Sequence, residues 1–137
     1  MSETEKKSKS NNQNAKFIQD IKRGDKEIDD IKPIIKYCTM SQELKMDTIS
    51  RIKEAMSKLI YIYIILNIET TIENNSNYFK TLSKKIKINM DSNTGEIWNV
   101  IVGTDYGAWI NFDKTYMLFL TMDELYFLIY RFGYDTK

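Results

Sequence analysis

The segment from Trp98 to Gly133 is apolar at odd and at even positions, and this pattern requires a β-sheet that is covered on both faces. Its main runs are WNVIVG, YMLFLTM and LYFLIYRF. A strand with one wet face alternates apolar and polar residues, as most antiparallel hairpins do. The sheet therefore needs helices on one side and a different apolar cover on the other. In a chain of 137 residues, a second copy of the same subunit is the simplest second cover.

Composition narrows the class of function. The formal net charge is +1, which gives no electrostatic reason to expect nucleic acid or a membrane as the main partner. The single Cys38 cannot form an internal disulfide, and the polar N-terminus shows no signal peptide, so we expect a reducing compartment. Histidine is absent, which removes Ser–His and Cys–His nucleophile pairs and imidazole metal ligands. We therefore expect no catalytic residues, no metal site and no cofactor.

The first 32 residues are predicted to be an extension of the domain that follows, which spans 33–137. Met1–Asn14 is rich in Lys, Ser and Asn and too poor in apolar residues to offset the entropy of ordering, so we expect disorder there. Ala15–Lys32 allows one or two short helical turns, because apolar residues occur in it among mixed charges: Phe17, Ile18, Ile21, Ile28 and Ile31. Pro33 then marks a boundary, since the residue before a proline favours extended geometry.

Two helices are predicted after a short strand at Ile34–Cys38. The first has either a capping box from Thr39 to Gln42 or Ser41 as its cap, and it extends to about Thr71. Its apolar face recurs at steps of three and four: Ile49, Ile52, Met56, Leu59 and Tyr63. The apolar run Leu59–Ile68 is too short to span a bilayer, which favours a place in the core or an interface.

The second helix is expected to begin at Ser76 or Asn77, after the break Asn74–Asn77, and to end before the turn formers Asp91–Gly95. Four strands follow, at Ile97–Val102, Ala108–Phe112, Thr115–Met122 and Leu125–Phe132. A solvated turn at Asp123–Glu124 separates the last two. The predicted fold class is α+β, with two helices packed on one face of a small antiparallel sheet.

Several of these residues resemble the eight-kilodalton dynein light chain family. The resemblance lies in Ile34-Ile35-Lys36, Met40-Ser41, Asp47 and Ala55, and in the pattern W-x-x-x-V-G-x-x-Y-G that starts at Trp98. It covers Ile34–Lys58 and Trp98–Gly133. Between them the chain is longer than typical members by roughly fifteen to twenty residues, a length that a surface excursion or a longer helix absorbs at modest entropic cost.

The resemblance implies a strand-swapped homodimer. In that family the strand corresponding to Ala108–Phe112 crosses to the partner's sheet, and two grooves at the dimer interface accept extended peptides of disordered partner proteins. It further implies a subunit of a dynein motor, bound to intermediate or heavy chains in the cytoplasm and cytoskeleton, with cytoplasmic and axonemal motors both open. Two alternatives remain, a motor-independent dimerisation hub, and a divergent member that uses Leu59–Ile68 or its charged tail as an interaction surface.

Site residues are carried over from the same resemblance. The implied peptide-binding residues are Lys36, Thr39, Tyr106, Gly107, Ala108, Trp109, Ile110, Asn111, Phe112, Met117, Phe119 and Thr121. The implied dimer-interface residues are Asn99, Ile101, Gly103, Trp109, Asn111 and Phe132. The residues that receive the peptide glutamine fit either Glu69-Thr70 or Ser76–Tyr78.

Several positions depart from the family pattern. Asn99 replaces a histidine that makes dimerisation pH-sensitive, so that switch should be missing. Phe132 replaces a phosphorylatable serine. In the groove, Asn111-Phe112 replaces a threonine-histidine pair, while Phe119 and Thr121 replace tyrosines. These changes remove hydrogen-bonding partners, and we expect a peptide preference that differs from the usual TQT type.

Overall fold

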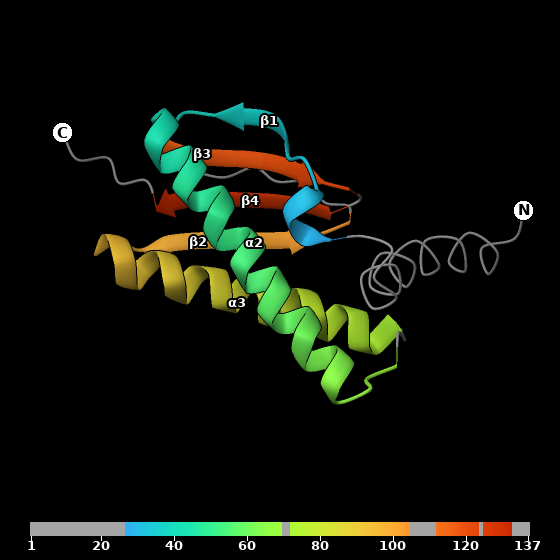
Figure 1. Ribbon diagram of the computed structural model, residues 1–137. Helices are drawn as coiled ribbons and strands as arrows, with labels where there is room; N and C mark the ends of the chain where they lie inside the picture. Colours follow the sequence, from blue (N-terminus) through green and yellow to red (C-terminus); the bar gives the residue numbers. More distant parts are fainter. Residues whose placement is uncertain (1–26, 70–71, 105–111, 124, 133–137) are drawn as a thin grey trace, which may run out of the picture.

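A computed structural model of the chain describes residues 27–69, 72–104, 112–123 and 125–132, with the side chains of 72–75, 112–115 and 132 left out. Its elements in order are η1 (Ile28–Asp30), β1 (Ile34–Cys38), α2 (Gln42–Ile65), α3 (Ile72–Thr94), β2 (Trp98–Gly103), β3 (Phe112–Met122) and β4 (Leu125–Phe132) (Figure 1). The predicted disorder of Met1–Asn14 and most of the predicted strand Ala108–Phe112 lie outside the described residues.

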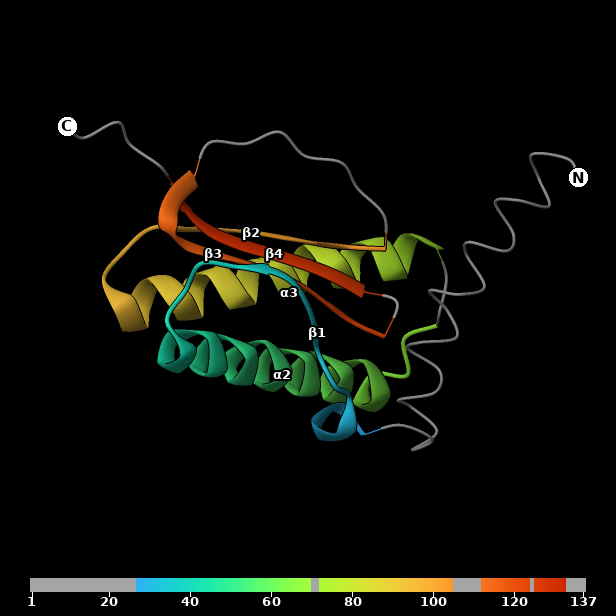
Figure 2. The ribbon, with the colours of Figure 1, turned by 90° about the horizontal axis from the view of Figure 1, so that it is seen from above.

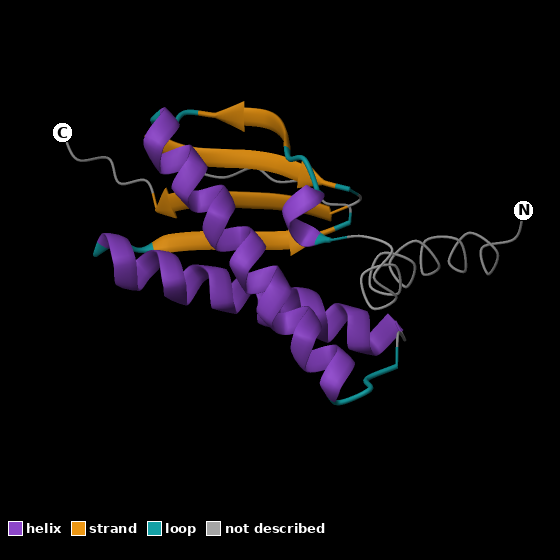
Figure 3. Ribbon diagram, in the orientation of Figure 1, coloured by secondary structure: helices purple, strands orange, loops and turns teal. Residues whose placement is uncertain are grey.

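The predicted α+β fold is confirmed. The four strands form one antiparallel sheet in the order β1-β3-β4-β2. Both long helices lie on the same side of this sheet (Figures 2 and 3). The last turns of α2 and the first turns of α3 reach beyond the β2 edge (Figure 1). No helix in the described ranges is long and apolar enough to cross a membrane.

Helix α2 begins at Ser41, whose hydroxyl accepts a hydrogen bond from the backbone N–H of Leu44 at 3.1 Å. Ser41, and not the Thr39–Gln42 capping box, is therefore the cap. The helix ends at Ile65, earlier than the predicted Thr71, because Asn67 adopts a left-handed conformation with φ 50°. The N–H of Ile68 then bonds the carbonyl of Tyr63 at 3.0 Å, which is the pattern of a Schellman C-cap.

Helix α3 is longer than predicted at both ends. It begins at Ile72 and continues through Asn74–Asn77, which the sequence marked as a break. It also continues through the turn formers to Thr94, and ends where Gly95 takes φ 74° and donates its N–H to the carbonyl of Asp91 at 3.1 Å. The chain between its two family-like regions therefore lies mainly in α2 and α3.

A hydrogen-bonded corner joins the end of α3 to β2. Asp91 accepts the backbone N–H of Trp98 at 2.8 Å, and Lys87 bonds both Asp91 Oδ2 and the carbonyl of Trp98 at 2.7 Å. The indole N–H of Trp98 donates to Thr94 Oγ1 at 2.8 Å. Trp98 is only 1% exposed, so its indole N–H is buried with its partner, as a buried tryptophan requires.

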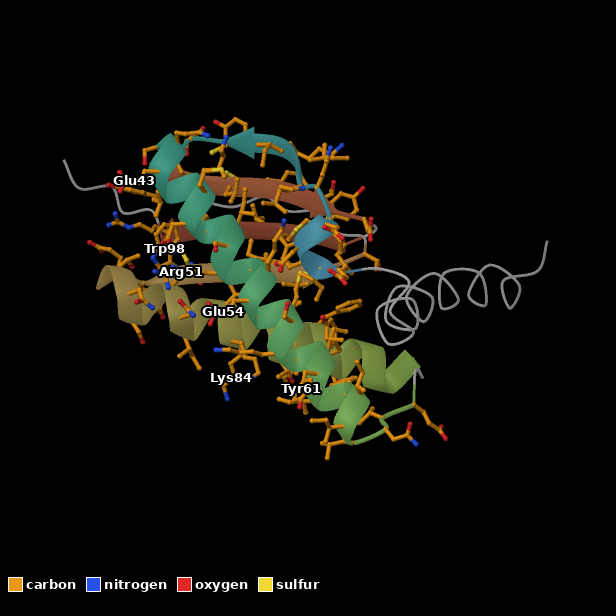
Figure 4. All side chains as sticks on the ribbon, in the orientation of Figure 1. Glu43, Arg51, Glu54, Tyr61, Lys84 and Trp98 are labelled. Atoms are coloured by element: carbon orange, nitrogen blue, oxygen red, sulfur yellow. The ribbon has the colours of Figure 1, made fainter. Side chains whose placement is uncertain are left out.

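The core lies between the helices and the sheet. Its fully buried side chains come from both helices and from every second position of the strands: Ile52, Met56, Tyr78, Leu82, Ile86, Met90, Trp98, Leu118, Leu120, Met122, Leu125, Phe127 and Ile129. Ile28 and Ile31, which precede Pro33, belong to the same core cluster. The packed structure therefore includes residues before the boundary suggested by that proline. Arg51 of α2 (Figure 4) pairs with Asp47 of the same helix at 2.8 Å and also donates to Asn89 of α3, which links the two helices.

Thr39 fixes the end of β1 against β3, and this contact predicts a stability change. Its backbone N–H donates to the carbonyl of Met117 at 2.9 Å, and its hydroxyl accepts the N–H of Met117 at 3.0 Å. Thr39→Val keeps the shape but leaves that part-buried N–H without an acceptor, so urea unfolding should show a loss of about 1–2 kcal/mol. Thr39→Ser keeps the oxygen and serves as the matched control. Equal losses in both variants would contradict this role.

The buried hydroxyl of Tyr78 predicts that its removal makes the protein more stable. Its hydroxyl is buried and has no hydrogen-bond partner in the described part of the chain, and its ring packs edge-on against Tyr63 at 5.4 Å. Burial raises the pKa of Tyr78 far above its usual value, and the electrostatic effect of the neighbouring Tyr63 adds a smaller rise. Tyr78→Phe should therefore raise the free energy of unfolding by about 1 kcal/mol at pH 7, since an unpaired buried hydroxyl carries a desolvation cost.

The same substitution has a pH signature. A tyrosine ionises in the unfolded chain near about pH 10, whereas the folded protein keeps Tyr78 protonated, so wild-type stability falls as pH rises above that value. Urea unfolding at pH 7 and at about pH 10.5, at one protein concentration, should show a larger gain from Tyr78→Phe at the higher pH. Tyr61→Phe, at an exposed position, should change neither curve. A loss of stability in Tyr78→Phe at pH 7 would contradict the assignment.

Candidate functional site

The sheet has a second face, directed away from the helices, which we call the outer face. Directly paired residues on neighbouring strands share a face, so the register assigns them. Trp98, Val100 and Val102 of β2 pair with Arg131, Ile129 and Phe127 of β4, and these residues lie toward the helices. The alternate positions form the outer face: Asn99, Ile101, Gly103, Met117, Phe119, Thr121, Tyr126, Leu128 and Tyr130, with Ile34 and Tyr37 of β1.

The outer face is organised in rows that cross the strands. The central row runs from Ile101 through Leu128 and Phe119 to Tyr37, and every member is apolar or aromatic. One flanking row is Asn99, Tyr130 and Met117. The other is Gly103, Tyr126, Thr121 and Ile34. The more polar side chains thus lie beside an apolar centre, which is the layout of a contact surface with a wet rim.

Two residues of the outer face are buried, one in the central row and one in a flanking row. Leu128 of the central row is 3% exposed although it does not belong to the core cluster on the helix side, and Thr121 of the flanking row is 6% exposed. Ile101 and Phe119 are half-buried, and Tyr37 at the end of the central row is exposed. The rings of Phe119 and Tyr126 stack with centroids 6.0 Å apart. Aromatic rings in such a stack supply a rigid apolar surface to whatever covers this face.

Two groups of predicted site residues come together here. The interface residues Asn99, Ile101 and Gly103 lie on the same face as the groove residues Met117, Phe119 and Thr121. Thr39 is bonded to Met117 at the end of β1, and Lys36 is exposed on β1, the outer strand beyond β3.

Other predicted site residues can be placed only in part or not at all. Those from the predicted crossing strand and the turn before it lie outside the described residues: Tyr106, Gly107, Ala108, Trp109, Ile110 and Asn111. Phe112 and Phe132 are described by their backbones alone, and they pair with each other. Phe112 therefore starts β3 and does not end a separate strand, and a register shift follows it before Met117.

Five residues of the outer face were missed from the sequence, Ile34 and Tyr37 of β1 and three residues of β4. The three, Tyr126, Leu128 and Tyr130, alternate along β4 with the core residues Phe127 and Ile129. Side chains at alternate positions of a strand point to opposite faces, so these residues form two sets. Every position of β4 is apolar or aromatic up to Arg131, and the sequence therefore did not show which set faces the helices.

The edges of the sheet complete the site. In the described part of the chain, β2 pairs with β4 only and is an outer strand, as β1 is on the other side. The second edge of an outer strand presents backbone N–H and C=O groups that another strand can pair with. The residues that the structure describes hold no group of three acidic, cysteine or histidine side chains suited to a metal ion.

Known proteins match both the sequence and the architecture. The family model described as dynein light chain type 1 matches residues 32–132. "Dynein light chain 1, cytoplasmic" of Saccharomyces cerevisiae is 24% identical over 99 residues, which are 72% of this chain and 89% of that protein. The protein of the same name from Kluyveromyces lactis is 31% identical over 52 residues, which are 38% of this chain and 60% of that protein, less than two thirds of its length.

A solved structure supports the fold. The dynein light chain-like domain of the calcium binding protein FhCaBP2 from Fasciola hepatica superposes with a TM-score of 0.56 at 15% identity, covering 79% of this chain and 98% of that one. A mercury derivative of that domain gives a TM-score of 0.52. At this identity the likeness concerns the fold alone. The family match extends from just before β1 to the last residue of β4, and the chain therefore belongs to the dynein light chain type 1 family.

Proposed function

We propose that this protein is a non-catalytic dynein light chain that acts as a strand-swapped homodimer and binds extended peptide segments by β-strand addition. The observation that carries the proposal is the apolar central row of the outer face, Ile101, Leu128 and Phe119. The helices of the described residues cover only the opposite face of the sheet. A second copy laid on the outer face brings the same rows together about a two-fold axis, as an isologous interface requires.

The ends of β2 and β3 support a crossing strand. The last residue of β2, Gly103, pairs with Tyr126, whereas the first residue of β3, Phe112, pairs with Phe132. These pairs lie at opposite ends of β4, and β2 and β3 point the same way (Figure 1). In the proposed dimer, residues 104–111 connect these two ends of the sheet. Eight residues extend to at most about 26–29 Å, and the proposed crossing strand uses that reach.

In the proposed dimer that segment lies against the outer edge of the partner's β2. Its own second edge then offers backbone groups to a bound peptide, whose main chain adds as one more strand. The peptide's alternate side chains reach toward Phe119 and Thr121, at positions where the family has tyrosines. Because those hydroxyl partners are changed, the preferred sequence differs from the usual TQT type.

We place the protein with a cytoplasmic dynein, bound to its intermediate or heavy chains. Support comes from the family match and from the two yeast relatives, both of which are named cytoplasmic dynein light chains. A motor-independent hub for disordered partners uses the same groove. Co-purification of dynein intermediate or heavy chains with the full chain separates the two roles.

Peptide binding by strand addition predicts a periodic response to backbone methylation. A peptide selected for binding is N-methylated at its odd residues in one version and at its even residues in another. In a peptide that adds as a strand, the backbone N–H groups of alternate residues point toward the protein strand that it pairs with, and the others point away. Calorimetric titration should therefore show a loss of at least about tenfold in affinity for one version and a much smaller loss for the other.

Two results would overturn parts of this proposal. Equal losses for the odd and even versions would contradict strand addition, because a periodic edge distinguishes alternate residues. A TQT peptide of the family type, measured under the same conditions, should bind more weakly than the selected peptide. Equal affinity for both would refute the altered preference while leaving strand addition intact.

A further inference from the structure

The last turns of α2 expose an apolar surface that neither the core nor the proposed dimer explains. Tyr61, Ile62, Ile64 and Ile65 on the last turns of α2 and the C-cap Leu66 are between 40% and 65% exposed, while Tyr63 among them is buried. Tyr61 is visible there, where the helix reaches beyond the sheet (Figure 4). Single exposed apolar residues are ordinary, but a contiguous group of this kind marks a contact surface.

Part of this surface borders a groove between α2 and η1. The groove has a volume of about 280 Å³ and is lined by Glu27, Ile28, Asp29, Ser57, Ile60, Tyr61 and Ile64. Ile28 and Ile60 are buried and form its apolar floor, while Tyr61 and Ile64 are exposed at its rim. Glu27 and Asp29, both exposed, make the η1 side of the groove acidic.

The chain itself supplies a segment that fits this groove. Glu27, a lining residue, is the first described residue, and 26 residues precede it. Within them Phe17, Ile18 and Ile21 have the i, i+1, i+4 spacing that places three side chains on one side of a helical turn. The six steps from Ile21 to Glu27 extend to at most about 20 Å, so the groove is within reach.

Charge favours the same occupant. Residues 15–26 carry Lys16, Lys22, Arg23 and Lys26 against Asp20 and Asp25, a net charge of +2. The η1 side of the groove is lined by the carboxylates Glu27 and Asp29, and Lys53 of α2 donates to the backbone carbonyl of Asp29 at 3.2 Å. The basic side chains of residues 15–26 are attracted to the carboxylates on the η1 side of the groove at short range. This attraction is stronger at low salt than at high salt.

We infer that Phe17, Ile18 and Ile21 dock as one helical turn into the groove between η1 and α2 of their own chain. The docked segment covers the groove-side residues Tyr61 and Ile64 of α2 and holds η1 against that helix. Any partner that uses this end of α2 must first displace the segment. The inference concerns the helical side of the molecule and stands or fails independently of the peptide groove.

Disulfide trapping in the full-length protein tests this contact. In a Cys38→Ser background, Ile21→Cys is combined with Ile64→Cys at the groove rim. The matched control combines Ile21→Cys with Ile88→Cys, an exposed isoleucine of α3 that is 54% exposed and does not line the groove. Under mild oxidation the first pair should form a disulfide within one chain at least about tenfold faster than the control pair.

Hydrogen exchange gives a second measurement that needs no added cysteine. Ile18→Asp combined with Ile21→Asp should speed exchange of the amides in 57–66 on the order of tenfold, because that end of α2 loses its cover. Ser8→Asp combined with Asn12→Asp adds the same charge outside the apolar cluster and should change nothing there. Equal trapping rates for the two cysteine pairs, a disulfide that joins two chains, or unchanged exchange in 57–66 would each overturn the inference.

Discussion

The structure depends on a sheet whose two faces are both apolar. On one face, side chains such as Phe127 and Ile129 are removed from water by α2, α3 and η1. On the other, the row Ile101–Leu128–Phe119 crosses the middle of the sheet, and no helix among the residues that the structure describes lies over it. Burial of apolar area contributes about 25 cal/mol per Å², so a face of this kind gains stability when a second apolar surface covers it. The proposed dimer meets that requirement, and the resemblance to the dynein light chain family adds the crossing strand and the peptide groove to the proposal.

The sequence predicted the two helices and the buried face of α2, but it did not predict where the helices begin and end. The three-and-four spacing from Ile49 to Tyr63 predicted the buried face of α2 correctly. The stop and start signals failed because asparagine is ambiguous. Asn67 takes a left-handed conformation and ends a helix, whereas Asn74–Asn77 lie inside one. Tertiary packing decides between these outcomes, since the helix that contains Asn77 also buries Tyr78 against Tyr63.

The candidate site was predictable in kind, and only partly in its residues. The resemblance pointed to Asn99, Ile101, Met117 and Phe119, and the register places all four on the outer face. Leu128 was missed because β4 is apolar at consecutive positions, so only pairing with β2 and β3 reveals which side chains share a face. Thr39 shows the opposite case. Its hydroxyl bonds a neighbouring strand, a structural role that no sequence pattern indicated.

The most direct measurement of the central claim is sedimentation equilibrium of the full chain at micromolar concentration. A strand-swapped dimer should sediment as a particle of twice the chain mass of 16.2 kDa. Ile101→Asp places a charge in the central row and should shift that particle to the single-chain mass, whereas Ile88→Asp on α3 should not. A folded wild-type chain that sediments at the single-chain mass under these conditions would contradict the account.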